Sequence, residues 1–213
     1  MADLVYSEGI IQRLSQYLRH VITLKDIGKR TVTSQNISDI TKINSAEVRR
    51  DLIYFGIKGK RGVGFNIDDL IKAFNKILGH EENVRIVLVG AGNLGRAILN
   101  YKMLNKFGFI IENVFDNDEN IVGKKILGKE ILDITFMKTT IKNKSLKVAI
   151  LAVNTDSAQS VANLLVDSGI KVIINYTSVP VKVPSNINVQ AADPIQILLH
   201  TLYYLSHTGQ TFQ

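Results

Sequence analysis

The chain has 213 residues, of which 46% are apolar and 21% are charged. These values exclude an intrinsically disordered protein, which is poorer in apolar residues. Because the chain contains no cysteine, it has no disulfide framework, thiolate nucleophile or cysteine-ligated metal, and we expect no metal site. The sequence also lacks the ~18-residue uncharged apolar run that a membrane span needs and the pattern of a secretory signal. We therefore expect a cytoplasmic protein without a membrane partner.

The net charge of +7 is unevenly distributed. In the stretch 42–61, the basic residues are Lys42, Arg49, Arg50, Lys58, Lys60 and Arg61, against only Glu47 and Asp51 as acidic residues. Such a basic cluster favours a polyanionic partner, above all nucleic acid. A solvated surface face is the alternative interpretation.

Residues 1–80 have the apolar periodicity of helices. Spacings of three and four predict helices over residues 10–22, 34–41, 45–55 and 68–78. Asn44 or Ser45 can cap the third helix, with Glu47 at a capping-box spacing. The segment 56–65 contains four glycines and predicts a turn-rich hairpin.

From residue 81 the pattern changes to short apolar runs that alternate with helical stretches. Strands are expected at 84–89, 110–115, 148–153 and 172–176, and helices at 93–105 and 157–168. Asp193 and Pro194 can cap and open a final helix, whose apolar residues lie nearly all round it, so we expect it to be buried on most sides. This alternation indicates an α/β protein with a parallel sheet.

The segment Gly90-Ala91-Gly92-Asn93-Leu94-Gly95 matches G-x-G-x-x-G between a predicted strand and a predicted helix, which is the context of a dinucleotide-binding turn. Gly90 permits the tight turn, Gly92 lets the backbone approach a pyrophosphate, and Gly95 lets the helix pack closely. Asp116 ends the second strand, where a carboxylate binds ribose hydroxyls and repels a 2′-phosphate, which favours NAD(H) over NADP(H). A glycine-rich turn that binds nothing, or a CoA-type site, remains open.

The second and third predicted helices form a helix-turn-helix, whose second helix enters the major groove of DNA. Arg49 and Arg50 on that helix can bind guanine edges. Ser45 and Tyr54 are candidate phosphate contacts. The hairpin that follows would be a wing with a mobile tip and two short strands. Its residues Lys60 and Arg61 could reach the minor groove. A generic helical subdomain is the alternative interpretation.

Taken together, these residues resemble the Rex family of bacterial redox-sensing repressors. The most specific marks are Val48-Arg49-Arg50-Asp51-Leu52, Tyr54-Phe55-Gly56, Arg61-Gly62-Val63-Gly64, the glycine loop with Phe115-Asp116, Gly169-Ile170-Lys171 and the Asp193 helix. The resemblance implies a winged-helix domain at 1–80, a Rossmann domain at 81–192, a C-terminal helix at 193–206 exchanged between the protomers of a homodimer, and a tail at 207–213. It also implies repression at palindromic operator DNA, with release on NADH binding and with NADH and NAD+ as regulatory ligands.

The resemblance also assigns roles to single residues. Arg49, Arg50, Lys58 and Arg61 match family DNA contacts, and Val153, Asn154 and Tyr101 fall at coenzyme-binding positions. Arg19, Tyr101 and Asp193 match a family switch network. The alternative roles are a surface arginine, a core tyrosine and a helix cap. Two departures stand out: Asn154 replaces a common proline, and Pro194 replaces a leucine or phenylalanine.

The rival functions are a small NAD-dependent dehydrogenase and a CoA-binding Rossmann module. A dehydrogenase needs a proton donor or acceptor beside the nicotinamide, and no Tyr-x-x-x-Lys pair follows a predicted strand. The chain also has little length left for a substrate domain. We therefore expect a regulator and not an enzyme.

Overall fold

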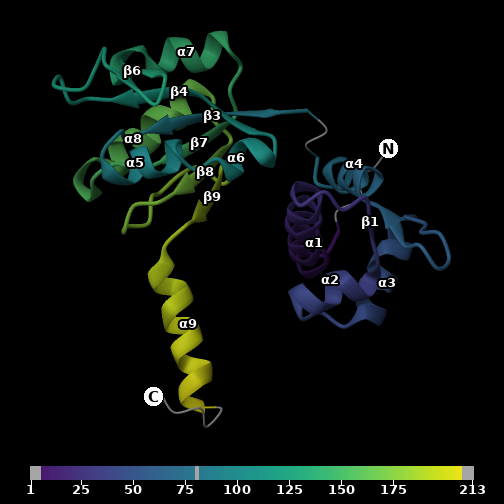
Figure 1. The fold of residues 1–213 in the computed structure, drawn as a ribbon. Coiled ribbons are helices and arrows are strands. Elements are labelled where there is room, and N and C mark those ends of the chain that lie inside the picture. Colours follow the sequence, from purple (N-terminus) through teal and green to yellow (C-terminus); the bar gives the residue numbers. More distant parts are fainter. Residues whose placement is uncertain (1–5, 80–81, 208–213) are drawn as a thin grey trace. The chain divides into compact units, whose positions relative to one another are not determined.

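The computed structural model describes residues 6–79 and 82–207 (Figure 1). The chain divides into two compact units, Met1–Glu82 and Asn83–Gln213, and each is described by itself. No helix in the described part is long and apolar enough to cross a membrane. Most of the predicted tail lies outside the described residues.

The described part of the first unit, residues 6–79, consists of four helices and a small antiparallel sheet. Its elements are α1 (Glu8–Asp26), β1 (Thr31–Val32), α2 (Ser34–Thr41), α3 (Ser45–Tyr54), β2 (Phe65–Asn66) and α4 (Ile67–Ile77). The core is formed by apolar side chains of all four helices, with Tyr17, Ile37, Leu52 and Phe74 each 0% exposed. The predicted helices are therefore present, and their apolar faces meet.

Side-chain caps set the helix starts in this unit. Asn44 caps α3 by accepting a hydrogen bond from the Ala46 backbone N–H, 2.8 Å away. The last helix begins earlier than predicted, at Ile67, because Asn66 accepts from the backbone N–H of Asp69. The sequence pattern placed this start at the aspartates, which lie in the first turn instead.

The hairpin after α3 differs from the predicted wing of two short strands. Its backbone pairing is a single bridge between Lys60 and Gly64. The strand after it, β2, pairs with β1, which precedes α2 in the chain. Gly64 allows this arrangement, since it has φ +94° and a Cβ there would lie 2.4 Å from the Val32 carbonyl oxygen.

The second unit is built on a seven-stranded sheet with the order β5-β6-β4-β3-β7-β8-β9. The strands are β3 (Val84–Val89), β4 (Phe109–Asp116), β5 (Lys125–Ile126), β6 (Lys129–Asp133), β7 (Val148–Leu151), β8 (Val172–Asn175) and β9 (Asn188–Ala191). All neighbours are parallel except β5 and β6. The parallel strands have the doubly wound order 3-2-1-4-5-6 of a Rossmann fold. The sequence pattern did not reveal β5, β6 or β9.

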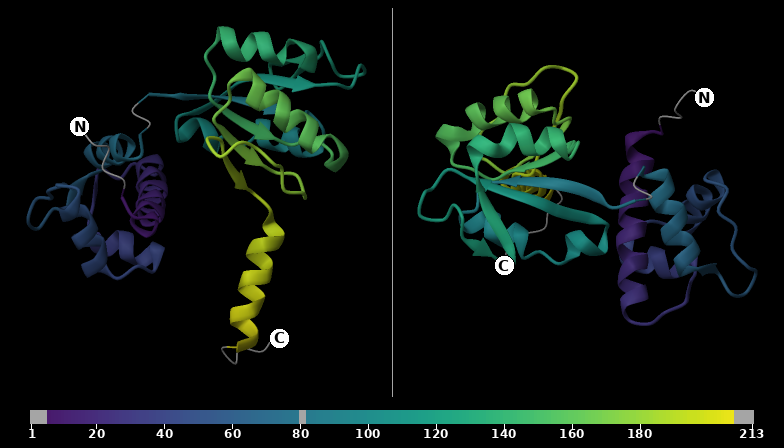
Figure 2. Two further views of the ribbon diagram at one scale, coloured as in Figure 1. Left: turned by 180° about the vertical axis from the view of Figure 1, so that it is seen from behind. Right: turned by 90° about the horizontal axis from the view of Figure 1, so that it is seen from above.

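Helices cover both faces of this sheet (Figures 1 and 2). They are α5 (Asn93–Leu99), α6 (Met103–Lys106), α7 (Met137–Asn143), which follows the 3-10 turn Ile134–Phe136, and α8 (Thr155–Ser168). The last helix, α9 (Pro194–His207), extends away from the sheet (Figure 1). Val87 and Val89 pack toward α7 and α8, while Ile86 and Leu88 pack toward α5. Because both faces of β3 are covered, all four residues from Ile86 to Val89 are buried and apolar.

One helix prediction needs correction. The single helix expected over 93–105 is two helices, because α5 ends at Leu99 and the chain turns through Asn100 and Tyr101 before α6. The final helix, which we expect a partner subunit to bury, is exposed in the single chain. The exposed fractions of Ile195, Ile197, Leu198, Leu199 and Leu202 range from 44% to 70%.

Candidate functional sites

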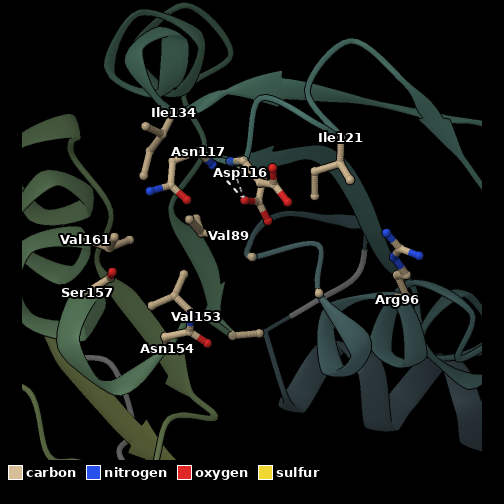
Figure 3. Close-up of a pocket in the computed structure, with 14 residues that line it drawn as sticks. Val89, Arg96, Asp116, Asn117, Ile121, Ile134, Val153, Asn154, Ser157 and Val161 are labelled. Atoms are coloured by element: carbon tan, nitrogen blue, oxygen red, sulfur yellow. Dashed lines mark hydrogen bonds between the residues drawn. The ribbon is translucent and has the colours of Figure 1, made fainter.

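A cavity of about 270 Å³ opens at the carboxyl ends of β3, β4 and β7 (Figure 3). Its lining residues are Val89, Gly90, Gly92, Arg96, Asp116, Asn117, Asp118, Ile121, Ile134, Ala152, Val153, Asn154, Ser157 and Val161. This is the point where the strand order reverses from β4 on one side of β3 to β7 on the other. Open α/β sheets bind their ligands at such switch points.

The three glycines of the loop have different roles. Gly90 has φ +99°, and a Cβ there would lie 2.2 Å from the Ala152 carbonyl oxygen. A Cβ on Gly95 would lie 1.9 Å from the Gly90 carbonyl oxygen. Gly92 has no protein atom within 4 Å of a built Cβ, and it faces the cavity. Gly90 and Gly95 are therefore required by the protein's own packing, whereas the space beside Gly92 is open.

The carboxylate of Asp116 already accepts three backbone hydrogen bonds. Ala91 donates to Oδ2 at 2.6 Å, and Asn117 and Asp118 donate to Oδ1 at 2.8 and 3.0 Å. A carboxylate has about four lone-pair positions, so the capacity left for ribose hydroxyls is small. Asp116 thus ties the glycine loop to the end of β4 as well as lining the cavity, a structural role that the sequence did not reveal.

Arg96 is a cavity residue that sequence reasoning missed. Its Nε donates to the Ala91 carbonyl oxygen at 2.9 Å, and its guanidinium lies on the Asp116 and Ile121 side of the cavity (Figure 3). Ala91 is therefore held at its N–H by Asp116 and at its carbonyl by Arg96. The sequence signal that could have identified Arg96 is its position directly after Gly95, the last glycine of the motif.

The opposite side of the cavity is formed by Val153, Asn154, Ser157 and Val161 (Figure 3). Asn154 is the N-cap residue of α8, and its side chain makes no capping hydrogen bond. Its amide is exposed at the mouth of the cavity. A polar donor and acceptor therefore stands where the resemblance anticipates a proline.

Other residues predicted for coenzyme binding do not line this cavity. Ala91 is buried, and Asn93 and Leu94 are exposed at the start of α5. Tyr101 lies in a different place: it lines a second cavity of about 230 Å³ beside Leu127 and is 52% exposed. The structure therefore does not bring Tyr101 together with the glycine loop.

In the first unit, the predicted DNA-contact residues lie on α3 and the hairpin after it. Arg49, Arg50, Lys58, Lys60 and Arg61 are all exposed. Ser45 is the first residue of α3 and is half-buried. Two neighbouring elements of this unit thus present an exposed basic surface.

Tyr54 is exposed at the end of α3 and packs against two other aromatic rings. Its ring centroid lies 6.0 Å from that of Tyr6 and 5.4 Å from that of Phe55, both edge-on. Such pairs stabilise the contact beyond the area that they bury. The hydroxyl group of Tyr54 remains a candidate phosphate contact.

The predicted switch residues lie on separate elements. Arg19 is exposed on α1, and Asp193 caps α9 by accepting from the Ile195 backbone N–H at 2.9 Å. The cap is the role that the sequence pattern predicted. Among the described residues, no group of three or more histidine, aspartate or glutamate side chains could hold a metal ion.

Comparisons with known proteins cover both units. A family model described as "Putative DNA-binding protein N-terminus" matches residues 7–52. A second, described as "CoA binding domain", matches residues 81–179. CoA and NAD(H) both contain an adenosine diphosphate, so this second match describes the fold and the ADP-binding turn without separating the two ligands.

The redox-sensing transcriptional repressor Rex of Rubrobacter xylanophilus is 41% identical over 198 residues, which cover 93% of this chain and 92% of the relative. The crystal structure of RSP with β-NAD+ and operator DNA is similar with a TM-score of 0.82 and 30% identity, and covers 97% of this chain and 95% of that one. The crystal structure of RSP with β-NADH has a TM-score of 0.79 and 29% identity, with 97% of each chain covered. The relative is named as a repressor, which supports the expectation of a regulator over an enzyme. The extent and identity of these matches place the chain in the Rex family of redox-sensing transcriptional repressors.

Proposed function

We propose that this chain represses transcription by binding operator DNA through α3 and its hairpin, and that NADH bound at the glycine loop releases it. The observation that carries this proposal is one chain with two separate sites: a switch-point cavity with open space beside Gly92, and a helix with exposed arginines. In the related structures, RSP is bound to β-NADH, or to β-NAD+ together with operator DNA.

The residues that line the cavity suit a dinucleotide chemically. A pyrophosphate can approach the backbone at Gly92, where no side chain intervenes. The adenosine ribose would lie beside Asp116, and the nicotinamide would lie toward Val153 and Asn154 on the other side. CoA carries a phosphate on this ribose, and the nearby Asp116 carboxylate repels it, so NADH and NAD+ fit better than CoA.

The basic surface of the first unit fits double-stranded DNA. Arg49 and Arg50 would enter the major groove with α3, and Ser45 and Tyr54 would contact phosphates. The hairpin residues Lys58, Lys60 and Arg61 would bind phosphates or the minor groove. The exposure of all five basic side chains supports this assignment.

The repressor would act as a homodimer in the cytoplasm. The apolar side chains of α9 are more than two-fifths exposed, and burying them against a second copy would remove this surface from water.

We assign the domains to residues 1–80, 81–192 and 193–206, with a tail at 207–213. Arg19, Tyr101 and Asp193 would form the switch network between the two copies.

NADH and NAD+ differ by one positive charge and by the planarity of the nicotinamide ring. A sensor must bind the two forms with different affinities in its DNA-bound and released states, since equal affinities shift nothing. Asn154 supplies polar groups at the nicotinamide end of the cavity. In the dimer, the nicotinamide state would change the separation of the two α3 helices and therefore their fit to adjacent major grooves.

An electrophoretic mobility shift assay tests the proposal. A palindromic duplex is first isolated from random-sequence DNA by its binding to the wild-type protein. The protein is then mixed with this selected duplex, and NADH and NAD+ are titrated separately. We expect NADH to release the duplex at a concentration at which NAD+ does not. Arg49→Ala should abolish preference for the selected duplex, whereas Lys171→Ala, on the loop before β8, should not. Operator binding that saturating NADH leaves unchanged would contradict the proposed function.

A further inference from the structure

A buried carboxylate lies beneath the exposed arginines of α3. Asp51 is 5% exposed, and Tyr17 of α1 is 0% exposed. Arg13 of α1 donates to Asp51 twice, from Nε to Oδ2 at 2.7 Å and from Nη2 to Oδ1 at 2.8 Å. The Tyr17 hydroxyl donates to Oδ2 at 2.8 Å. Three hydrogen bonds from α1 therefore end on one carboxylate of α3.

This carboxylate is held in its charged form. Burial raises the pKa of Asp51, but the hydrogen bonds from Arg13 and Tyr17 outweigh burial and bring that pKa below its ordinary value. The same bond to Asp51 raises the pKa of Arg13, against its own desolvation. Arg13 also approaches Glu47, with Nη1 3.5 Å from Oε1. The guanidinium thus contacts two acidic residues of α3 that are one helical turn apart.

These contacts are directional in a way that the apolar packing of α3 is not. Val48 and Leu52 of α3 are fully buried, but apolar burial is non-directional and tolerates small rotations of a helix. A two-point pairing between a planar guanidinium and a carboxylate restricts both distance and angle. Because successive helical residues diverge by about 100°, rotation of α3 about its axis would redirect Arg49 and Arg50.

We propose that Arg13, Tyr17 and Asp51 are positioning residues that set the rotation of α3, and thereby determine which base edges Arg49 and Arg50 reach. This inference rests on the proposed function, in which α3 reads DNA. It adds that sequence preference, and not only the stability of the unit, depends on a cluster that touches no DNA. Asp51 follows the two arginines directly in the sequence, so the reading residues and their anchor share one helical turn.

The test compares two duplexes of equal length, the selected palindrome and an unrelated sequence, at one salt concentration. Tyr17→Phe removes a single hydroxyl, and Arg13→Lys keeps the charge but loses the two-point geometry. We expect each variant to bind the palindrome at least tenfold more weakly, with less than a twofold change for the unrelated duplex. Lys25→Met is the matched control, because it removes the exposed ion pair of α1 with Asp68 on α4 (2.7 Å), and it should leave both affinities unchanged.

A double-mutant cycle separates positioning from stability. Arg49→Ala should weaken palindrome binding strongly in the wild type and much less in a Tyr17→Phe background, because Arg49 would already be misdirected there. Thermal unfolding and NADH binding verify that each variant is folded. Additive effects, or an equal loss for both duplexes, would overturn the inference while leaving the proposed function intact. A wild-type protein that does not distinguish the duplexes would instead contradict the proposed function.

Discussion

The glycine loop allows a paired test, because the same substitution should have opposite consequences at Gly92 and at Gly95, three residues further on. Gly95→Ala places a Cβ 1.9 Å from the Gly90 carbonyl oxygen, so either the helix or the loop must move. Overpacking of this kind costs about 1–3 kcal/mol. For a chain of this length, each kcal/mol corresponds to about 2–4 °C in melting temperature. We therefore expect Gly95→Ala to lower Tm by roughly 2–12 °C.

Gly92→Ala should behave in the opposite way. Gly92 has φ −68° and ψ −164°, an extended conformation that alanine adopts readily, and its Cβ would meet no protein atom within 4 Å. Stability should change by less than about 1 kcal/mol, with a gain possible through the unfolded state. The new methyl group would occupy the ligand's space, so NADH affinity should fall at least tenfold, which is about 1.4 kcal/mol.

Differential scanning calorimetry and the fluorescence of bound NADH measure the two effects on the same samples. The reasoning predicts that Gly95→Ala loses stability and that Gly92→Ala loses NADH without losing stability. If Gly92→Ala melts as low as Gly95→Ala, the loop geometry described above is wrong. If Gly92→Ala binds NADH as the wild type does, the dinucleotide does not pass over this residue.

Three further outcomes are expected. The pKa of Asp51 lies below its ordinary value because the hydrogen bonds from Arg13 and Tyr17 outweigh burial. The stabilisation that Asp51 contributes is therefore fully present above the unfolded pKa near 3.8 and is lost as pH falls through the lower folded pKa. In urea unfolding from pH 7 to pH 3, the free energy of unfolding should fall more steeply with acid in the wild type than in Arg13→Lys. Gly64→Ala places a Cβ 2.4 Å from the Val32 carbonyl oxygen at φ +94°, so the base of the hairpin should distort and palindrome affinity should fall at least tenfold in a mobility shift assay, while NADH binding stays constant. Arg96→Gln removes a cation from the adenosine side of the cavity, so the ratio of NADH to NADPH affinity should rise at least threefold in competition titrations, and an unchanged ratio would exclude Arg96 from coenzyme selectivity.

The predictable parts of the site were those with a local backbone signature. The G-x-G-x-x-G run after a buried strand places Gly90 and Gly95 where close packing demands them, and Asp116 at a strand end falls in the cavity. Arg96 was missed because its position after the last motif glycine does not by itself show that the side chain lines the cavity. Its contact with Ala91 depends on how the loop folds back over α5.

The less predictable parts were those that depend on distant partners. The strands β5, β6 and β9 are short or partly polar. The places of β6 and β9 in the sheet are set by parallel pairing with β4 and β8, which no local pattern shows. The glycine pattern predicts that the hairpin after α3 forms two short strands that pair with each other. The strand that pairs with β2 lies more than 30 residues earlier instead, a distance over which local patterns carry no information.

The amino-acid sequence by itself determined the two-part organisation, the helical and α/β classes, the dinucleotide turn and the exposed basic helix. Apolar periodicity and glycine spacing are local properties of the sequence, so they can be identified without knowledge of the folded structure. Tertiary structure alone decided that Asp51 is buried under Arg13 and Tyr17 across 34 to 38 residues of chain, and that the Asp116 carboxylate accepts a hydrogen bond from the backbone N–H of Ala91, 25 residues earlier. Hydrogen bonds between residues far apart depend on the relative placement of whole elements, which only the packed core establishes.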